Sequence, residues 1–86
     1  MVEKLTLKDG TELENSYATE TLDNLFLYIR NGMNMMQVFM LMADTSKTSE
    51  ITYTAGSTTV MYEGYTMVQG ITQEHGGMIN VVLRRG

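Results

Sequence analysis

The sequence contains no cysteine, no proline and no tryptophan. Without cysteine the chain has neither disulfide bonds nor thiolate metal sites, and it does not depend on an oxidising compartment. The absence of proline is consistent with continuous strand pairing, because proline cannot donate to the hydrogen-bond ladder of a sheet. We therefore expect an intracellular protein that folds alone or together with copies of itself.

Long apolar runs are also missing. No stretch approaches the ~20 residues of a membrane span. The first residues, "MVEKLTLKDG", alternate charged and apolar side chains, whereas a signal peptide has a basic region followed by an apolar one. The sequence therefore predicts no signal peptide and no membrane partner.

Positive charge is scarce. Six Lys and Arg residues stand against ten Asp and Glu residues, which gives a net charge of -4. This balance opposes the phosphate attraction on which nucleic-acid binding depends, and the basic residues are scattered along the chain. We expect no direct nucleic-acid partner.

Catalytic groups are few. His75 is the only histidine and lies in the polar segment "QEHGGM". A single histidine without cysteine leaves metal binding to carboxylates, and no serine lies in a Gly-x-Ser-x-Gly elbow. The eight glycines form neither a dinucleotide fingerprint nor a phosphate loop. We therefore expect no enzyme activity, no metal and no cofactor.

The first third of the chain carries strand patterns. In "VEKLTLKDGTELEN", Leu5 and Leu7 alternate with polar residues, and Asp9-Gly10 predicts the turn of a hairpin. Residues 15–24 are polar and predict a loop that carries Tyr17 inward. Residues 25–32, "LFLYIRNG", fit either a helical face or a buried strand. We choose a strand because the run is short and ends at Asn-Gly; its inward residues would be Leu25, Leu27 and Ile29.

A helix is expected from about residue 35 to residue 43. Asn34 and Gln37 have the spacing of a capping box, and Met33 and Val38 that of a hydrophobic staple. After residue 50 the period changes to that of strands, with turn or bulge signals at residues 55–57, 63–64 and 75–77. The inward positions predicted there are Ile51, Tyr53, Val60, Tyr62, Met67, Ile71, Ile79, Val81 and Leu83.

These patterns predict a single α+β domain over residues 1–86. Its core would be a small antiparallel β-sheet or partly open barrel of about five to seven strands, with one short helix inserted after the third strand. The 43% of hydrophobic residues suits a globular chain.

Four segments in order cover most of the chain: "KLTLKDGTELEN", "NLFLYIRNGMNMMQVFMLMADTSKTSEI", "TTVMYEGYTMVQGI" and "GGMINVVLRRG". In this order they resemble small uncharacterised proteins encoded by phages and prophages of gut Firmicutes. That family tends to place Thr at the helix cap and Glu three residues later, where this chain has Asn34 and Gln37. The resemblance implies a location in the cytoplasm of a bacterial host cell or in the virion, and it attaches no activity.

The expected helix is apolar almost all round. Met35, Val38, Phe39 and Met42 form the stripe that would face the sheet, while Met36, Met40 and Leu41 lie on the other side. Flexible methionine is common where a surface adapts to a partner. Burial of the second side between the sheet and a loop is the alternative, and both explanations stay open.

Two further groups of residues complete the candidate surfaces. Tyr62 and Tyr65 join Met36, Met40 and Leu41 as a candidate protein interface, although core packing with the hydroxyl group at the rim is the favoured explanation for any one tyrosine. Glu12, Glu14, Glu20 and Asp23 form a candidate acidic edge.

Two functions are compatible with this sequence. The first is a non-enzymatic protein-interaction module of phage type, a small virion or assembly component that packs against a partner protein or associates with itself as a homo-oligomer. The alternative is a phage-encoded inhibitor of a host defence nuclease (anti-CRISPR-like), whose carboxylates would occupy a basic nucleic-acid channel.

Overall fold

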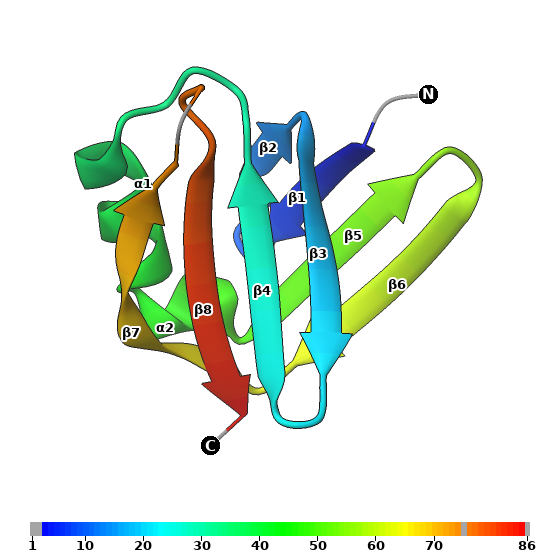
Figure 1. The fold of residues 1–86 in the computed structure, drawn as a ribbon. Helices are drawn as coiled ribbons and strands as arrows, with labels where there is room; N and C mark the ends of the chain where they lie inside the picture. Colours follow the sequence, from blue (N-terminus) through cyan, green and yellow to red (C-terminus); the bar gives the residue numbers. More distant parts are fainter. Residues whose placement is uncertain (1–2, 75, 86) are drawn as a thin grey trace.

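The computed structural model describes residues 3–74 and 76–85. These residues form eight strands and two helices, which is a small α+β fold (Figure 1). In chain order the elements are β1 (Glu3–Leu7), β2 (Glu12–Glu14), β3 (Ser16–Thr21), β4 (Asn24–Ile29), α1 (Met35–Met42), α2 (Thr45–Thr48), β5 (Glu50–Ala55), β6 (Thr58–Glu63), β7 (Tyr65–Gln73) and β8 (Ile79–Arg85).

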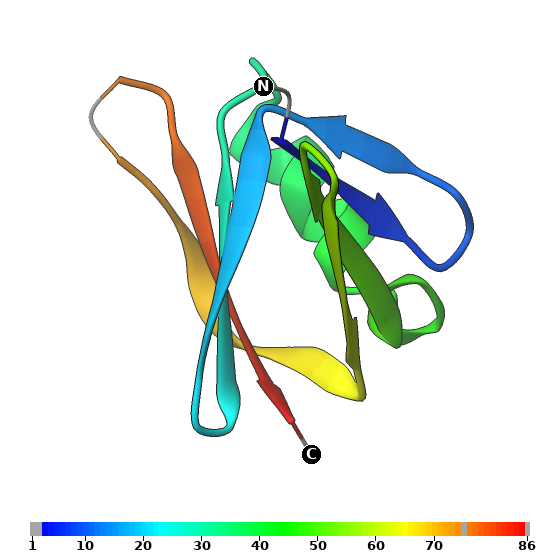
Figure 2. The same cartoon turned by 90° about the vertical axis from the view of Figure 1, so that its right-hand side faces the viewer.

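The strands form two antiparallel sheets of four. One sheet has the order β2-β1-β5-β6 and the other the order β3-β4-β8-β7. The described strands therefore do not close into a barrel, and their number exceeds the predicted five to seven. Figure 2 shows the two sheets facing each other, with the helices in the space where the sheets diverge.

The first hairpin is confirmed. Leu5 of β1 pairs with Leu13 of β2, and both side chains are buried. Gly10 has a φ of +93°, a value that L side chains rarely adopt. The amide of Thr11 donates to Asp9 Oδ1 at 3.0 Å, so the aspartate also braces the turn.

The loop predicted for residues 15–24 is wrong, because β3 occupies most of it. Ser16 and Ala18 are buried, and Tyr17 points outward and stacks on Tyr28 with ring centroids 4.6 Å apart. An edge strand with one face in water can have the same polar composition as a loop. Here the inward residues Ser16 and Ala18 are small, so the alternation of apolar and polar residues is not visible in the sequence. Tyr17 is therefore not carried inward.

The strand assignment for residues 25–32 is confirmed as β4. Leu25, Leu27 and Ile29 are buried as predicted. Each lies opposite a buried residue of β8: the pairs are Leu25 with Leu83, Leu27 with Val81, and Ile29 with Ile79. This ladder is the middle of the β3-β4-β8-β7 sheet.

The predicted helix is confirmed as α1, with its capping box. The amide of Gln37 donates to Asn34 Oδ1 at 2.8 Å, and the amide of Asn34 donates to Gln37 Oε1 at 3.1 Å. The helix follows the fourth strand, and not the third as predicted, because β3 was missed. The one-turn helix α2, capped by Asp44, was also not predicted.

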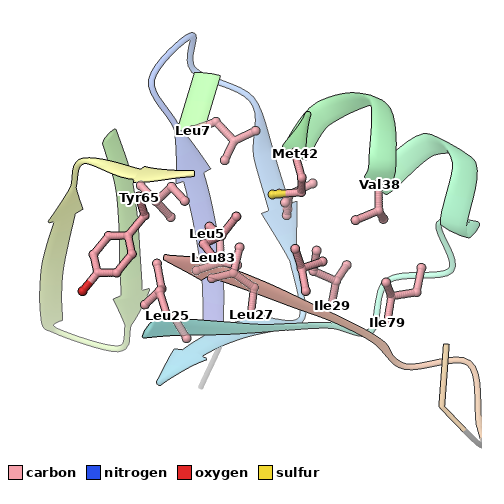
Figure 3. Packing of buried hydrophobic residues seen from close by; sticks show 14 residues of the cluster. Leu5, Leu7, Leu25, Leu27, Ile29, Val38, Met42, Tyr65, Ile79 and Leu83 are labelled. Carbon is pink, nitrogen blue, oxygen red and sulfur yellow. The ribbon is translucent and has the colours of Figure 1, made fainter. Parts of the chain in front are cut away.

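The core lies between the two sheets and under α1. Val38 and Met42 point from α1 toward Ile29 and Ile79, as Figure 3 shows, and all four side chains are buried. Leu5 and Ile51 contribute from the other sheet, where they are fully buried. The helix therefore closes the open side of the two-sheet core.

In the second half of the chain most inward positions are confirmed. Ile51, Ile79, Val81 and Leu83 are buried, and the partly buried residues that pack on the core are Tyr53, Tyr62, Met67 and Ile71. Val60 is an exception, since 39% of it is exposed on the edge strand β6. Gly64, with a φ of +79°, lies where the chain leaves one sheet for the other. The prediction for His75 falls outside the described residues.

The capping box gives a direct test of α1. Replacing Asn34 with alanine leaves helix amides without acceptors, so we expect a loss of about 1 kcal/mol of unfolding free energy. For a domain of this size that lowers the melting temperature by roughly 4–8 °C. Asn34→Asp keeps an acceptor and should melt close to the wild type. The melting temperatures are measured by circular dichroism. Equal melting temperatures for Asn34→Ala and the wild type would contradict the role of the cap.

Candidate interaction surface on helix α1

The outer side of α1 is an exposed apolar surface. Met36 and Met40 are each 67% exposed, Phe39 is 47% exposed and Met35 is 36% exposed. No residue of Met35–Met42 carries a charge. We call these four residues the methionine surface.

The inward stripe predicted for α1 is partly wrong. Val38 and Met42 are buried as expected, but Met35 and Phe39 are exposed. Leu41, predicted on the outer side, is partly buried and packs against the core. The buried arc is shifted toward Leu41 because the chain turns into α2, which contacts α1. The apolar stripe of one helix does not show where the next helix packs against it.

The structure rules out one of the two explanations for Met36 and Met40 on the second side of the helix. Met36 and Met40 are four residues apart and lie one turn apart on the same side. Their exposure excludes burial of these two side chains inside one copy of the chain. The surplus apolar area is therefore on the molecular surface.

Two shallow hollows flank the methionine surface. One, of about 330 Å³, is lined by Met35, Met36, Phe39 and Ile71. The other, of about 520 Å³, is lined by Met33, Gln37, Met40, Leu41, Asp44 and Lys47. Met36 and Met40 thus form a ridge between two recesses, a shape that can interlock with the side chains of another protein. The sequence pattern indicated the methionines but gave no sign of the hollows.

Among the described residues that line the two hollows, the charged ones are Asp44 and Lys47, both at the larger hollow. Lys47 Nζ lies 3.8 Å from Asp9 Oδ2, so its charge is partly balanced within the chain. Asp44 caps α2, and its hydrogen bonds from Ser46 lower the pKa of its carboxyl group. An apolar centre with a polar rim is the usual anatomy of a protein interface.

The two candidate tyrosines do not belong to this surface. Tyr65 is fully buried, which removes it from any interface, and Tyr62 is partly buried against the core. The Tyr65 hydroxyl donates to the Glu20 carboxylate, and the Arg85 guanidinium donates to both groups at 3.2 Å. Arg85 also lies 4.9 Å from the centre of the Tyr65 ring. This cluster ties β7 to β3 and β8.

The four candidate carboxylates do not form one edge. Glu12 and Glu14 lie on β2, whereas Glu20 and Asp23 lie near the β3–β4 turn at the opposite end of the molecule (Figure 1). Glu12 is paired with Lys4 at 2.7 Å and Glu20 with Arg85 at 3.2 Å. The acidic charge is therefore divided and partly neutralised.

Three further features of the described residues concern metal binding, a polar hollow and membrane-spanning helices. Among them no group of three or more His, Asp or Glu residues is placed to hold a metal ion. A polar hollow of about 210 Å³ is lined by Glu3, Asn15, Tyr17 and Arg30, and the Glu3 carboxylate there already accepts from the Tyr53 hydroxyl. In the described part of the chain, no helix has the length and hydrophobicity to cross a membrane.

No family model matches this chain, and neither curated proteins nor solved structures are significantly similar to it. The candidate site is therefore defined by its own geometry.

The Tyr53–Glu3 contact predicts an alkaline response. The hydrogen bond to Glu3 is the main cause that raises the pKa of Tyr53 to about 12, and burial of the phenol is the second cause. The pKa is raised on folding, so the stability that this phenol contributes is present below pH ~10 and is lost as the pH rises toward about 12. Glu3→Gln should lower the pKa of Tyr53 toward the ordinary value of a tyrosine. The titration is measured by the absorbance of tyrosinate, and the Tyr53→Phe variant shows which step of the titration belongs to Tyr53. Glu12→Gln is the control, and an unmoved titration in Glu3→Gln would contradict the assignment.

Proposed function

We propose that this chain is a non-enzymatic protein-interaction module and that the methionine surface packs against an apolar patch of another protein. One observation carries the proposal: Met36 and Met40, both 67% exposed, stand on a capped helix without a single charged residue. Exposed methionines contribute nothing to the core of the free chain. Their burial against a partner would remove apolar area from water at ~25 cal/mol per Å².

The chemistry of the surface favours a protein partner. Methionine side chains are flexible and polarisable, so they adapt to the shape that they meet. Phe39 supplies an aromatic anchor beside them, and aromatic residues are frequent among the residues that dominate binding energy. The hollows on either side can accept side chains of the partner.

The resemblance to phage and prophage proteins sets the context of this proposal. We take the partner to be a subunit of a phage particle or of its assembly machinery, in the bacterial cytoplasm or in the virion. The rival function, an inhibitor that mimics nucleic acid with its carboxylates, has less support. Its four candidate carboxylates are split between two ends of the molecule, and two of them are ion-paired.

The test is a pair of charge substitutions, Met36→Glu with Met40→Glu. Both side chains are outside the core, so the double variant should melt cooperatively near the wild-type temperature. Partner binding should fall by about 100-fold or more, because two carboxylates would be desolvated against apolar groups. The readout is co-purification and titration with the proteins encoded by the neighbouring genes, expressed together with this chain.

Two controls make the result specific. Leu22, 95% exposed at the β3–β4 turn, is an apolar residue far from α1, so Leu22→Glu should bind as the wild type does. Val38 is fully buried, so Val38→Glu should prevent folding. Unchanged binding of the double variant would refute the proposed surface, and so would failure of the double variant to fold.

A further inference from the structure

Strand β6 is an exposed sheet edge. It pairs with β5 and, within the described residues, with no other strand. Five of its six residues are exposed, including Val60 at 39% and Met61 at 57%. Figure 1 shows the β5–β6 hairpin extending beyond β3, so the turn end of the hairpin projects from the rest of the molecule.

The three other sheet edges are protected. The edge strand β2 has three residues, two of them the exposed Glu12 and Glu14. The edge strand β7 has an irregular register between Met67 and Ile71 and is contacted by α1. The edge strand β3 lies against β1 and β5 of the other sheet. Short edge strands, charged side chains, bulges and covering elements prevent the edge of a sheet from pairing with other chains. The strand β6 has none of these features before Glu63.

The register of the hairpin fixes which backbone groups of β6 face outward. Gly56 and Ser57 form a two-residue turn between the paired residues Ala55 and Thr58. In such a hairpin that closing pair exchanges two hydrogen bonds, and hydrogen-bonded pairs then alternate along the ladder. Thr59 and Met61 therefore direct their N–H and C=O groups away from β5.

We propose that β6 pairs antiparallel with β6 of a second copy of this chain, around a two-fold axis at Val60. The two sheets would then form one continuous eight-stranded sheet. In this register Thr59 lies opposite the partner's Met61, and both residues present outward backbone groups. The two symmetric pairs supply four hydrogen bonds.

A second copy suits this edge because two β6 strands that run antiparallel place compatible side chains opposite each other. Val60 lies opposite the partner's Val60, and Thr58 lies opposite the partner's Tyr62. The charged residue Glu63 meets the partner's Ser57, so no like charges face each other. Val60 and Tyr62 share a face with Tyr53 and Ile51, so the pairing extends the core-facing side of the sheet and covers Val60.

This inference is independent of the methionine surface. The helix α1 contacts β7 and lies on the side of the molecule away from β6 (Figures 1 and 2). The dimer would therefore carry its two methionine surfaces at distant ends. A bivalent module of this kind binds a repetitive partner array more tightly than one copy does.

Sedimentation equilibrium across a concentration series tests the dimer. A six-residue strand pair is a small interface, so we expect a dissociation constant on the order of micromolar. Val60→Lys would place two lysines face to face on the axis and should weaken the dimer at least tenfold. Thr59→Pro, which removes an outward N–H and keeps the pairing with β5, should do the same. Cooperative melting of either variant shows that the monomer is intact.

A cysteine cross-link tests the register. The chain has no cysteine of its own, so Val60→Cys introduces the only thiol. Residues opposite each other in a non-hydrogen-bonded pair have Cα atoms about 4.5 Å apart, within the range of a disulfide. We expect Val60→Cys to form a covalent dimer under mild oxidation and Leu22→Cys to remain monomeric. Leu22→Lys is the matched control for sedimentation.

Three results would overturn the proposal. They are a wild type that is monomeric at every concentration, a dimer that survives Val60→Lys and Thr59→Pro, and a Val60→Cys variant that does not cross-link faster than Leu22→Cys. The Met36→Glu with Met40→Glu variant separates the two surfaces. It should keep the β6 dimer while it loses the partner, so loss of the dimer in that variant would assign self-association to α1.

Discussion

The pairing of β4 with β8 places three matched apolar pairs at the centre of one sheet, and the other layers pack on them. Leu25, Leu27 and Ile29 face Leu83, Val81 and Ile79, and none of these six side chains is more than 1% exposed. Each contributes ~1.5–3 kcal/mol by burial. The second sheet adds Leu5 and Ile51, while α1 adds Val38 and Met42. These contacts use only one side of α1, so the apolar residues on its other side lie outside the core.

Local patterns predicted the local structure well. Asp9-Gly10 specified the first hairpin, and Asn34 with Gln37 specified the start of α1, because turn and cap chemistry acts within a few residues. The strand β4 was recognised by the length of its apolar run. The strand β3 was missed because an edge strand needs inward residues on one face only, and here two of them are Ser16 and Ala18.

The candidate site was predicted less completely, since it depends on contacts between distant segments. The exposure of Met36 and Met40 matches one of the two explanations that the sequence left open. The exposure of Phe39, the partial burial of Leu41 and the hollow shared with Ile71 depend on where α2 and β7 lie. Tyr65 became a core residue because Glu20 and Arg85, 45 and 20 positions away, satisfy its hydroxyl group. No window along the chain contains all three.

The strand order also constrains how this chain folds. Ile29 pairs with Ile79, fifty positions later, so the central ladder forms only after a long loop has closed. The hairpins β1–β2, β3–β4 and β5–β6 join neighbouring segments and close short loops. Chains dominated by distant pairings fold more slowly than chains with local contacts. During synthesis β8 emerges after α1 and the β5–β6 hairpin, so β4 waits for its partner strand while α1 and that hairpin are already accessible to chaperones and to other copies of the chain.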